Sequence, residues 1–296
     1  MLTNIQPQFA PVVSTLEGAT ARGVLWHAAP GRFLLQVPDV ARYLVSDGAV
    51  ITIDRAPAAR DEEVMRFLNL TPLAALLFQR GNLAFHAASV SPPSPQQGKG
   101  GRGDDASAIL IAGDSGAGKS TLLAALLQRG WTMMCDDLAP VDVTEGGQVM
   151  VYPTAEDVRL WQNAREKLGF DQPPKVSNTF KASAPQPLRA IYWLSVYHKD
   201  NIELSELTGA ERFRAIGPLT YNSHIADALL DRAAYFRCAT AIARTVPMYR
   251  LRRPRGKWSV DELADKIVIA SAVCKAAYAS NQHAEIASSA KTASSR

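Results

Sequence analysis

Short runs of alternating apolar and polar residues fill the first part of the chain. Between residues 20 and 55 these runs are GVLWHA, RFLLQV, RYLVSD and AVITID, and they are separated by Pro, Gly and Asp. Alternation with a period of two, bounded by turn-forming residues, is typical of half-buried strands. The pattern predicts a meander of short strands. We expect it to be the main part of a small β-rich N-terminal region that spans residues 1–80 and ends in helical sequence.

The apolar spacing becomes helical in the segment 61–80, DEEVMRFLNLTPLAALLFQR. Its acidic residues come first, where the helix dipole is positive, and Gly81 follows as a stop signal. Pro72 interrupts the helical pattern, and a proline inside a helix removes a backbone donor. The segment therefore predicts one helix, or two that are divided near Pro72.

A second region alternates buried strands with helices. AILIAG is a continuous apolar run, which is typical of a strand buried on both faces of an α/β sheet. Strands are predicted at 83–90, 108–113, 131–135, 189–198 and 248–253. Helices are predicted at 119–129, 223–246 and 259–280. The fold class is therefore α/β, with a mixed β-sheet and flanking helices in a domain that spans residues 81–275.

Two segments have compositions that cannot pack. Residues 91–107, SPPSPQQGKGGRGDDAS, predict an exposed mobile insertion between two strands. Residues 276–296 are small and polar and predict a disordered tail.

Composition excludes several classes of protein. The chain has 296 residues, of which 47% are hydrophobic and 20% charged, so it can build a packed core. No apolar run reaches the length of about 18 residues that a membrane span needs, and the N-terminus does not resemble a secretory signal. The three cysteines are too widely spaced for a disulfide framework or a CxxC metal site. We expect a soluble protein in the reducing cytoplasm.

Charge is distributed unevenly between the two halves. Residues 1–148 contain 11 Lys/Arg and 14 Asp/Glu, whereas residues 149–296 contain 21 and 14. The positive second half favours an anionic partner. Its densest basic cluster is Arg250, Arg252, Arg253, Arg255 and Lys257, which is either a solvated strand end or a dock for an acidic segment or a phosphate. Nucleic acid is not favoured, because no basic stripe is interleaved with aromatic residues.

One motif has specific chemistry. The segment after the predicted strand 108–113 matches the phosphate-binding pattern G-x-x-x-x-G-K-[ST], and a strong helix follows it. In such a loop the glycines allow backbone N–H groups to wrap around phosphates, the lysine adds charge, and the hydroxyl binds Mg²⁺. The predicted nucleotide-binding residues are Gly113, Asp114, Ser115, Gly116, Ala117, Gly118, Lys119, Ser120 and Thr121.

Acidic and imidazole side chains are expected beside this loop. Asp136 and Asp137 come at the carboxyl end of the next apolar strand, where ligands of open α/β sheets collect. One carboxylate can hold Mg²⁺ and the other can accept a hydroxyl proton. His86 lies on the strand that we expect to neighbour the loop's own strand, so its imidazole could reach the γ-phosphate.

These residues resemble a known family. HAASV followed by ILIAGDSGAGKSTLLAALLQRGWTMMCDDLAPV is similar to the catalytic domain of HPr kinase/phosphorylase, over about residues 83–143. The chain lacks that family's separate N-terminal domain, so it is more similar to the stand-alone members, which include lasso-peptide precursor kinases. The resemblance implies a P-loop kinase core of the HPr-kinase type, and self-association, because HPr kinases are oligomers.

The resemblance also implies roles for individual residues. Lys119 and the loop would hold ATP, and Ser120 and Asp137 would bind Mg²⁺. Asp136 would be the catalytic base that accepts the proton of a substrate serine, and His86 would contact the transferred phosphate. The roles of the two aspartates remain interchangeable at this stage. The family's E-I-R-G-L-G signature is replaced by EDVRLW at residues 156–161, without its glycines. The resemblance therefore does not extend to the reverse reaction or to HPr as substrate.

We therefore expect an ATP- and Mg²⁺-dependent kinase that acts on a serine of a peptide or small protein, a class that includes lasso-type precursor peptides. Two alternatives remain open. The loop also occurs in compact small-molecule kinases, and a nucleotide switch or ATPase would use the same phosphate cradle. Against the ATPase, the sequence has no LSGGQ-like stretch and no long apolar strand that ends in Asp-Glu.

Overall fold

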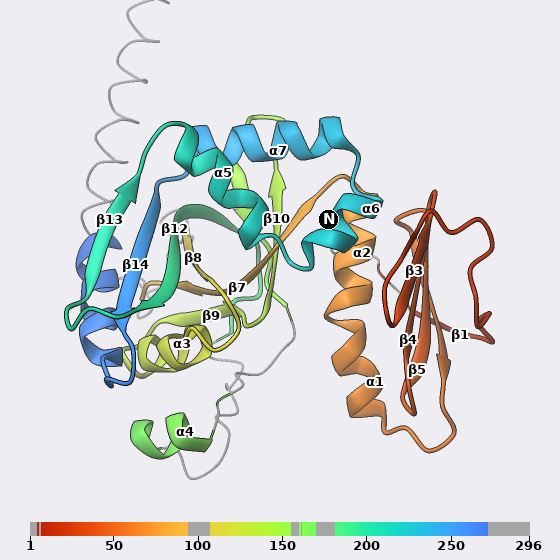
Figure 1. Cartoon of the computed structure of the whole chain (residues 1–296), viewed down its shortest axis with the longest axis horizontal. Helices are drawn as coiled ribbons and strands as arrows, with labels where there is room; N and C mark the ends of the chain where they lie inside the picture. The colour runs from red at the N-terminus through yellow and green to blue at the C-terminus, as the bar shows by residue number, and fades with distance from the viewer. Residues whose placement is uncertain are drawn as a thin grey trace, which may run out of the picture.

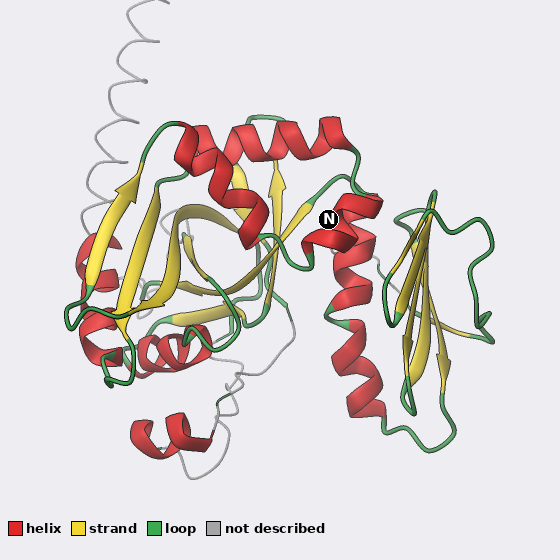
Figure 2. Cartoon of the chain, viewed as in Figure 1, coloured by secondary structure: helices red, strands yellow, loops and turns green. Residues whose placement is uncertain are grey.

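A computed structural model describes residues 5, 7–93, 107–154, 160, 162–169 and 181–271. Within this part of the chain, two β-sheets lie on either side of a pair of helices, as Figure 1 shows. The smaller sheet has six strands in the order β1-β6-β5-β4-β3-β2. The larger sheet has eight, in the order β11-β10-β7-β8-β12-β14-β13, with β9 paired to β7. The fold is mixed α/β with flanking helices (Figure 2).

The smaller sheet is the predicted meander. Its strands are β1 (Gln8–Phe9), β2 (Ala21–Arg22), β3 (Trp26–Ala29), β4 (Arg32–Val37), β5 (Ala41–Ser46) and β6 (Val50–Arg55). Strands β2 to β6 pair antiparallel in chain order. Burial alternates along β5 and β6, as the sequence pattern predicts, because one face of each strand packs against the helices.

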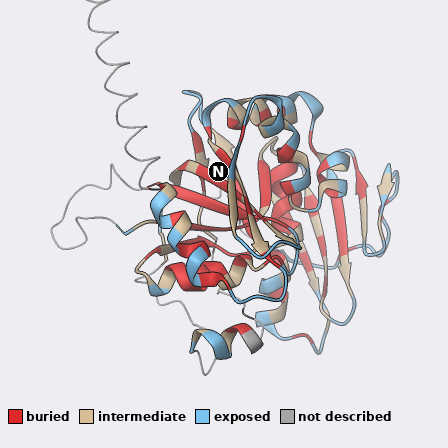
Figure 3. Cartoon of the chain, turned by 60° about the vertical axis from the view of Figure 1, so that its left-hand side comes forward, coloured by how far each residue is buried: buried red, intermediate tan, exposed pale blue. Residues whose placement is uncertain are grey.

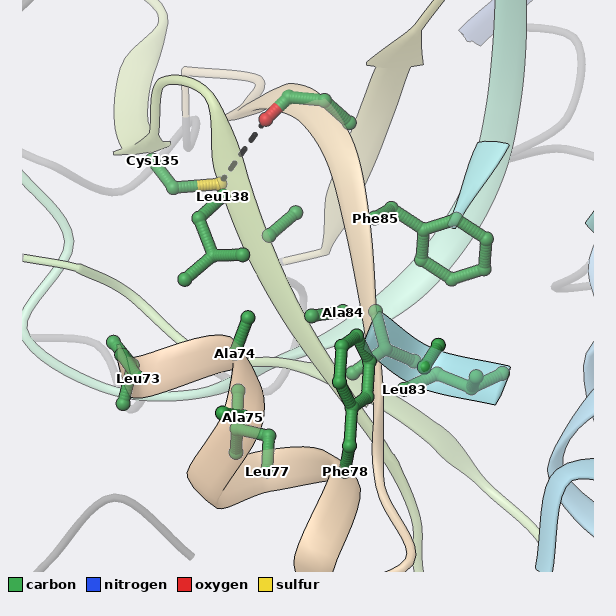
Figure 4. Close-up of a cluster of buried hydrophobic side chains, with 14 of the residues drawn as sticks. Leu73, Ala74, Ala75, Leu77, Phe78, Leu83, Ala84, Phe85, Cys135 and Leu138 are labelled. Atoms are coloured by element: carbon green, nitrogen blue, oxygen red, sulfur yellow. Dashed lines mark hydrogen bonds between the residues drawn. The ribbon is translucent and has the colours of Figure 1, made fainter. Parts of the chain in front are cut away.

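Two helices connect the sheets. They are α1 (Asp61–Leu68) and α2 (Thr71–Gln79), so of the two alternatives left open by the sequence the structure has two helices, divided just before Thr71. Pro72 lies in the first turn of α2, where a missing backbone donor costs nothing. Helix α2 contacts strands of both sheets and is buried over most of its length. Figure 4 shows its residue Phe78 beside Leu83 and Ala84 of the larger sheet, and Leu73 and Leu77 belong to the same buried cluster.

The strands of the larger sheet run in both directions. They are β7 (Leu83–Ser91), β8 (Ala108–Ala112), β9 (Thr132–Cys135), β10 (Leu138–Val143), β11 (Val149–Val151), β12 (Gln186–Tyr197), β13 (Glu203–Leu207) and β14 (Met248–Pro254). Strands β8, β12 and β14 are parallel, whereas β7 is antiparallel to both β8 and β9. Strands β8 and β9 therefore point the same way, and their carboxyl ends lie at one edge of the sheet.

Helices cover both faces of the larger sheet. One face packs against α3 (Lys119–Gln128) and a helix over residues 260–271, and the other against α2, α5 (Ala210–Leu219) and α7 (Arg232–Thr245). Helix α6 (Ser223–Leu229) contacts α2 and β3 instead. Strands β7 and β8 between the two layers are almost wholly buried (Figure 3). The remaining helix is α4 (Gln162–Leu168).

The structure differs from the sequence prediction in several elements. The single helix predicted at 223–246 is two helices, because the chain is extended at Leu230 and the carboxylate of Asp231 caps α7 by accepting from the backbone N–H of Ala234 at 2.9 Å. Helix α5 and strands β10, β11 and β13 were not predicted.

Several predictions concern parts of the chain outside the described residues. Most of the insertion 91–107, most of the segment 156–161 and the tail 276–296 lie there. Among the described residues, no helix has the length and apolar character to cross a membrane.

Candidate active site

A glycine-rich loop joins the buried strand β8 to helix α3. Gly113, Gly116 and Gly118 all have positive φ, at 147°, 78° and 108°. A side chain at Gly113 would collide with the neighbouring strand, since its Cβ would lie 2.2 Å from the carbonyl oxygen of Leu194 in β12. The loop can therefore lie against the sheet and turn into α3 only because glycine occupies these positions. This places the N-terminus of α3 at the carboxyl edge of the parallel strands.

Lys119 is the first residue of α3 and is only 5% exposed. Its ammonium donates to the carbonyl oxygens of Gly113 at 2.8 Å and of Asp114 at 3.1 Å. Burial lowers the pKa of Lys119, and the nearby carboxylates of Asp137, Asp136 and Asp114 oppose this shift in that order. The structure therefore places a buried ammonium, with three carboxylates nearby, at the glycine-rich loop, where the sequence predicts a positive charge.

The two adjacent aspartates follow β9 and differ in their surroundings. Asp136 is 1% exposed, and its Oδ1 accepts a hydrogen bond from the Ser120 hydroxyl at 2.9 Å. Asp137 has a left-handed φ of 74°, is half-buried and lines a cavity at the loop. The structure therefore brings Ser120 to Asp136, whereas the sequence expectation paired Ser120 with Asp137.

His86 lies beside the loop, as its predicted strand implies. Strand β7 pairs antiparallel with β8 in a register that sets Ala87 opposite Ala112, next to the first glycine of the loop. The imidazole contacts the ring of Tyr221 edge-on, with 6.1 Å between the ring centroids. Burial lowers the pKa of His86, the charge of Lys119 lowers it further, and Asp137 and Asp114 act in the opposite direction. The lowered pKa favours the uncharged form of the imidazole.

One cavity brings these groups together. It has a volume of about 610 Å³ and is lined by His86, Lys119, Ser120 and Asp137, together with the loop. Pockets for small molecules and cofactors usually have volumes of about 300–1,000 Å³. The chain thus gathers an imidazole, an ammonium, a hydroxyl and a carboxylate around one space of suitable size.

Arg253 also contacts the glycine-rich loop. Its Nε donates to the carbonyl oxygen of Ala117 at 2.7 Å, and its Nη2 donates to that of Gly116 at 3.5 Å. Burial lowers the pKa of this guanidinium.

The members of the basic cluster identified in the sequence lie in different surroundings. Arg253 and Lys257 line the cavity. Arg250 stacks over the ring of Trp193, and Arg252 forms an ion pair with Glu203 at 3.3 Å. The sequence showed a run of cations, but it did not show which of them faces the loop.

Cys135 precedes the aspartates and is a packing residue. It is fully buried, and its thiol donates weakly to the carbonyl oxygen of Ala87 at 3.9 Å, the dashed contact of Figure 4. Trp131 at the start of the same strand is also buried. Both residues belong to the buried core.

The side chains at the loop suit a magnesium ion. Ser120, Asp136 and Asp137 offer only oxygen atoms, and Mg²⁺ in proteins is usually held by one or two carboxylates, waters and substrate phosphates. Among the described residues, no group of three or more His, Cys, Asp or Glu side chains could hold a metal ion. Ser120, Asp136 and Asp137 are therefore the candidate ligands for a magnesium ion at the loop.

Comparisons with known proteins identify no family. No family model matches the chain, and no curated protein matches it either. Among solved structures, the chain is similar to the Hpr(Ser) kinase/phosphatase from Coxiella burnetii. The similarity covers 68% of this chain and 96% of that chain, at 15% sequence identity and a TM-score of 0.35. This is a distant structural relationship.

Proposed function

We propose that this protein is an ATP-dependent kinase that transfers the γ-phosphate to a serine hydroxyl of a peptide or small protein. The observation that supports it most strongly is the cavity in which the glycine-rich loop, Lys119, Asp137 and His86 meet. Phosphoryl transfer needs little covalent chemistry from the protein beyond positioning and charge neutralisation. These residues supply both. A lasso-type precursor peptide is one acceptor of this class.

The loop and α3 form the phosphate end of the proposed site. Backbone N–H groups at the N-terminus of α3 and in the loop favour anions. The ammonium of Lys119 is held at the loop by hydrogen bonds to two loop carbonyl oxygens and would exchange these for phosphate oxygens. The desolvation that lowers the pKa of Lys119 also strengthens its attraction for an anion.

The hydroxyl of Ser120 and the carboxylate of Asp136 would hold the magnesium ion, since they already share a hydrogen bond of 2.9 Å. Bound there, Mg²⁺ would neutralise charge on the phosphates. This assignment reverses the roles implied by the family resemblance, in which Asp137 was the metal ligand.

Asp137 is then the residue that accepts the acceptor's proton. It is half-buried and lines the cavity, whereas Asp136 is buried and hydrogen-bonded to Ser120. In the transfer, the serine oxygen forms a bond to the γ-phosphorus, the bond from that phosphorus to the bridging oxygen breaks, and ADP leaves. The hydroxyl proton passes to the carboxylate of Asp137.

His86 faces the same space as a neutral imidazole. Its lowered pKa keeps it uncharged near neutral pH, so it can donate one hydrogen bond to an oxygen of the phosphoryl group. The edge contact with Tyr221 orients the ring. We assign His86 to the stabilisation of the transferred group.

The test is the mass of a serine-containing peptide after incubation with protein, ATP and Mg²⁺. We expect a gain of one phosphate group with the wild type and none with Lys119→Ala. Asp137→Asn should lose transfer while retaining nucleotide binding, whereas Asp136→Asn should raise the Mg²⁺ concentration needed for activity. Asp200→Asn, at an exposed position in a turn, is the matched control and should transfer at the wild-type rate.

The other outcomes of this test identify the alternatives. Phosphate that appears on a sugar or nucleoside but on no peptide would make the protein a small-molecule kinase. Release of inorganic phosphate without any phosphorylated acceptor would make it an ATPase or nucleotide switch. Full activity of Asp137→Asn would refute the assignment of the base.

A further inference from the structure

The cavity at the glycine-rich loop has a second wall of different chemistry. This wall comes from the segment after β14 and the start of the helix 260–271, with residues Trp258, Ser259, Val260 and Leu263. Ala164 and Lys167 of α4 contribute as well. Lys167, and Lys257 of the segment after β14, are cations at this wall, whereas its other side chains are aromatic, aliphatic or a hydroxyl. The part around Trp258, Val260 and Leu263 is therefore suited to a flat, mostly apolar group.

Trp258 provides a surface for stacking. It is 37% exposed, so part of its ring is accessible, and it lines the cavity. The ammonium of Lys167 lies 5.0 Å from the centroid of its ring, a cation–π contact that restrains the indole. Partly exposed indole rings stack well on other aromatic rings, including every nucleobase.

Ser259 has an unsatisfied hydroxyl beside this ring. It is 5% exposed, and its Oγ has no hydrogen-bond partner among the described residues. A serine directly before a helix normally caps the first turn, but this one does not. A hydroxyl both donates and accepts, so a small rotation lets it meet a ring nitrogen or exocyclic amine of a ligand in the cavity.

The apolar part of the wall packs against α3, the helix that follows the glycine-rich loop. Val260 and Leu263 are buried and belong to the same core cluster as Leu122 and Leu126 of α3. The guanidinium of Arg129 at the end of α3 also pairs with two aspartates of the helix 260–271. Because α3 begins at the glycine-rich loop, this shared core connects the two walls of the cavity.

We propose that Trp258, Ser259, Val260 and Leu263 form the nucleobase subsite of the nucleotide whose phosphates the loop binds. This inference rests on the proposed function. The occupant is a purine, which stacks on Trp258 and hydrogen-bonds to Ser259. An aromatic side chain of the acceptor is the competing occupant, and the test separates the two.

The experiment compares two ligands by calorimetry, ADP and inorganic tripolyphosphate, both with Mg²⁺. Stacking on an aromatic side chain contributes enough affinity that Trp258→Ala should weaken ADP binding by about 5- to 150-fold. Ser259→Ala should weaken it by about 2- to 10-fold. Both variants should bind tripolyphosphate as the wild type does, and Trp258→Phe should restore most of the affinity for ADP. Phe236→Ala, at an exposed aromatic on α7, is the control and should change neither.

The outcomes separate this inference from the proposed function. If tripolyphosphate binds the wild type as tightly as ADP does, and Trp258→Ala changes neither affinity, the subsite is refuted while the phosphate site stands. If Trp258→Ala weakens both ligands equally, Trp258 supports the fold of the cavity and does not contact the base, which also refutes the subsite. If ADP binding is unchanged but the KM for the peptide rises, the wall binds the acceptor instead. If the wild type binds neither ligand, the proposed function itself fails.

Discussion

Replacement of Gly113 by alanine is the sharpest test of how the glycine-rich loop is held. The added Cβ would lie 2.2 Å from the carbonyl oxygen of Leu194, in a strand at the centre of the larger sheet. That oxygen belongs to the backbone and cannot rotate away. The φ of 147° is also one that residues with a Cβ rarely adopt. Strand β8 and the loop would have to separate from β12.

Gly116→Ala is the matched control in the same loop. Gly116 has a φ of 78°, and a Cβ there would meet nothing within 4 Å. Its substitution therefore costs only the conformational penalty, about 1–2 kcal/mol. Gly113→Ala adds a collision with backbone and should cost at least about 4 kcal/mol, which is at the extreme of single substitutions. In a protein of this size each kcal/mol lowers Tm by roughly 2–4 °C.

Thermal unfolding followed by circular dichroism measures both variants. We expect Gly116→Ala to lower Tm by about 2–8 °C and Gly113→Ala to lower it by about 8 °C or more. Equal losses for the two variants would show that the loop does not lie against Leu194. The position described for the glycine-rich loop against the sheet would then be wrong.

Three further predictions concern side chains around the site. Burial lowers the pKa of His86 below its usual 6.5, so the unfolded chain takes up this proton first as the pH falls. The wild type should therefore lose stability relative to His86→Gln as the pH drops through 6.5, and a difference in Tm that is independent of pH would contradict this. Arg253→Lys cannot reproduce the hydrogen bond from Nε to the carbonyl oxygen of Ala117. We expect it to raise the Kd for ADP, measured by calorimetry, by about tenfold. An unchanged Kd would show that this contact does not shape the loop. Arg129→Ala removes ion pairs with exposed carboxylates and should change the free energy of unfolding in urea by less than about 1 kcal/mol; a loss above about 2 kcal/mol would mean that these pairs hold the two helices together.

Local patterns in the sequence predicted the elements that carry the site. The apolar run of β8, the glycine-rich loop and α3 are adjacent in the chain, and each has a strong signal of its own. The position of His86 beside the loop was also expected, because β7 and β8 are consecutive strands and such strands usually pair. The N-terminal meander followed from strict alternation with short turns.

Other features depend on contacts between distant residues and could not be predicted. Arg253 contacts Ala117 across 136 positions of the chain, so no local pattern singles it out from the neighbouring arginines. The choice of Asp136 as the partner of Ser120 depends on the left-handed backbone at Asp137, which turns the two side chains into different surroundings.

Helix α5 was not predicted for a different reason. It contains Pro218, and a proline within a helical pattern normally indicates that a helix ends or breaks there.

The most direct test of the central claim is a crystal structure with Mg²⁺ and a non-hydrolysable ATP analogue. The account predicts the β- and γ-phosphates in the loop between residues 113 and 120, the metal on Ser120 and Asp136, and the γ-phosphate facing Asp137 and His86. A triphosphate bound elsewhere on the chain, or a γ-phosphate that faces away from both of these side chains, would contradict the account.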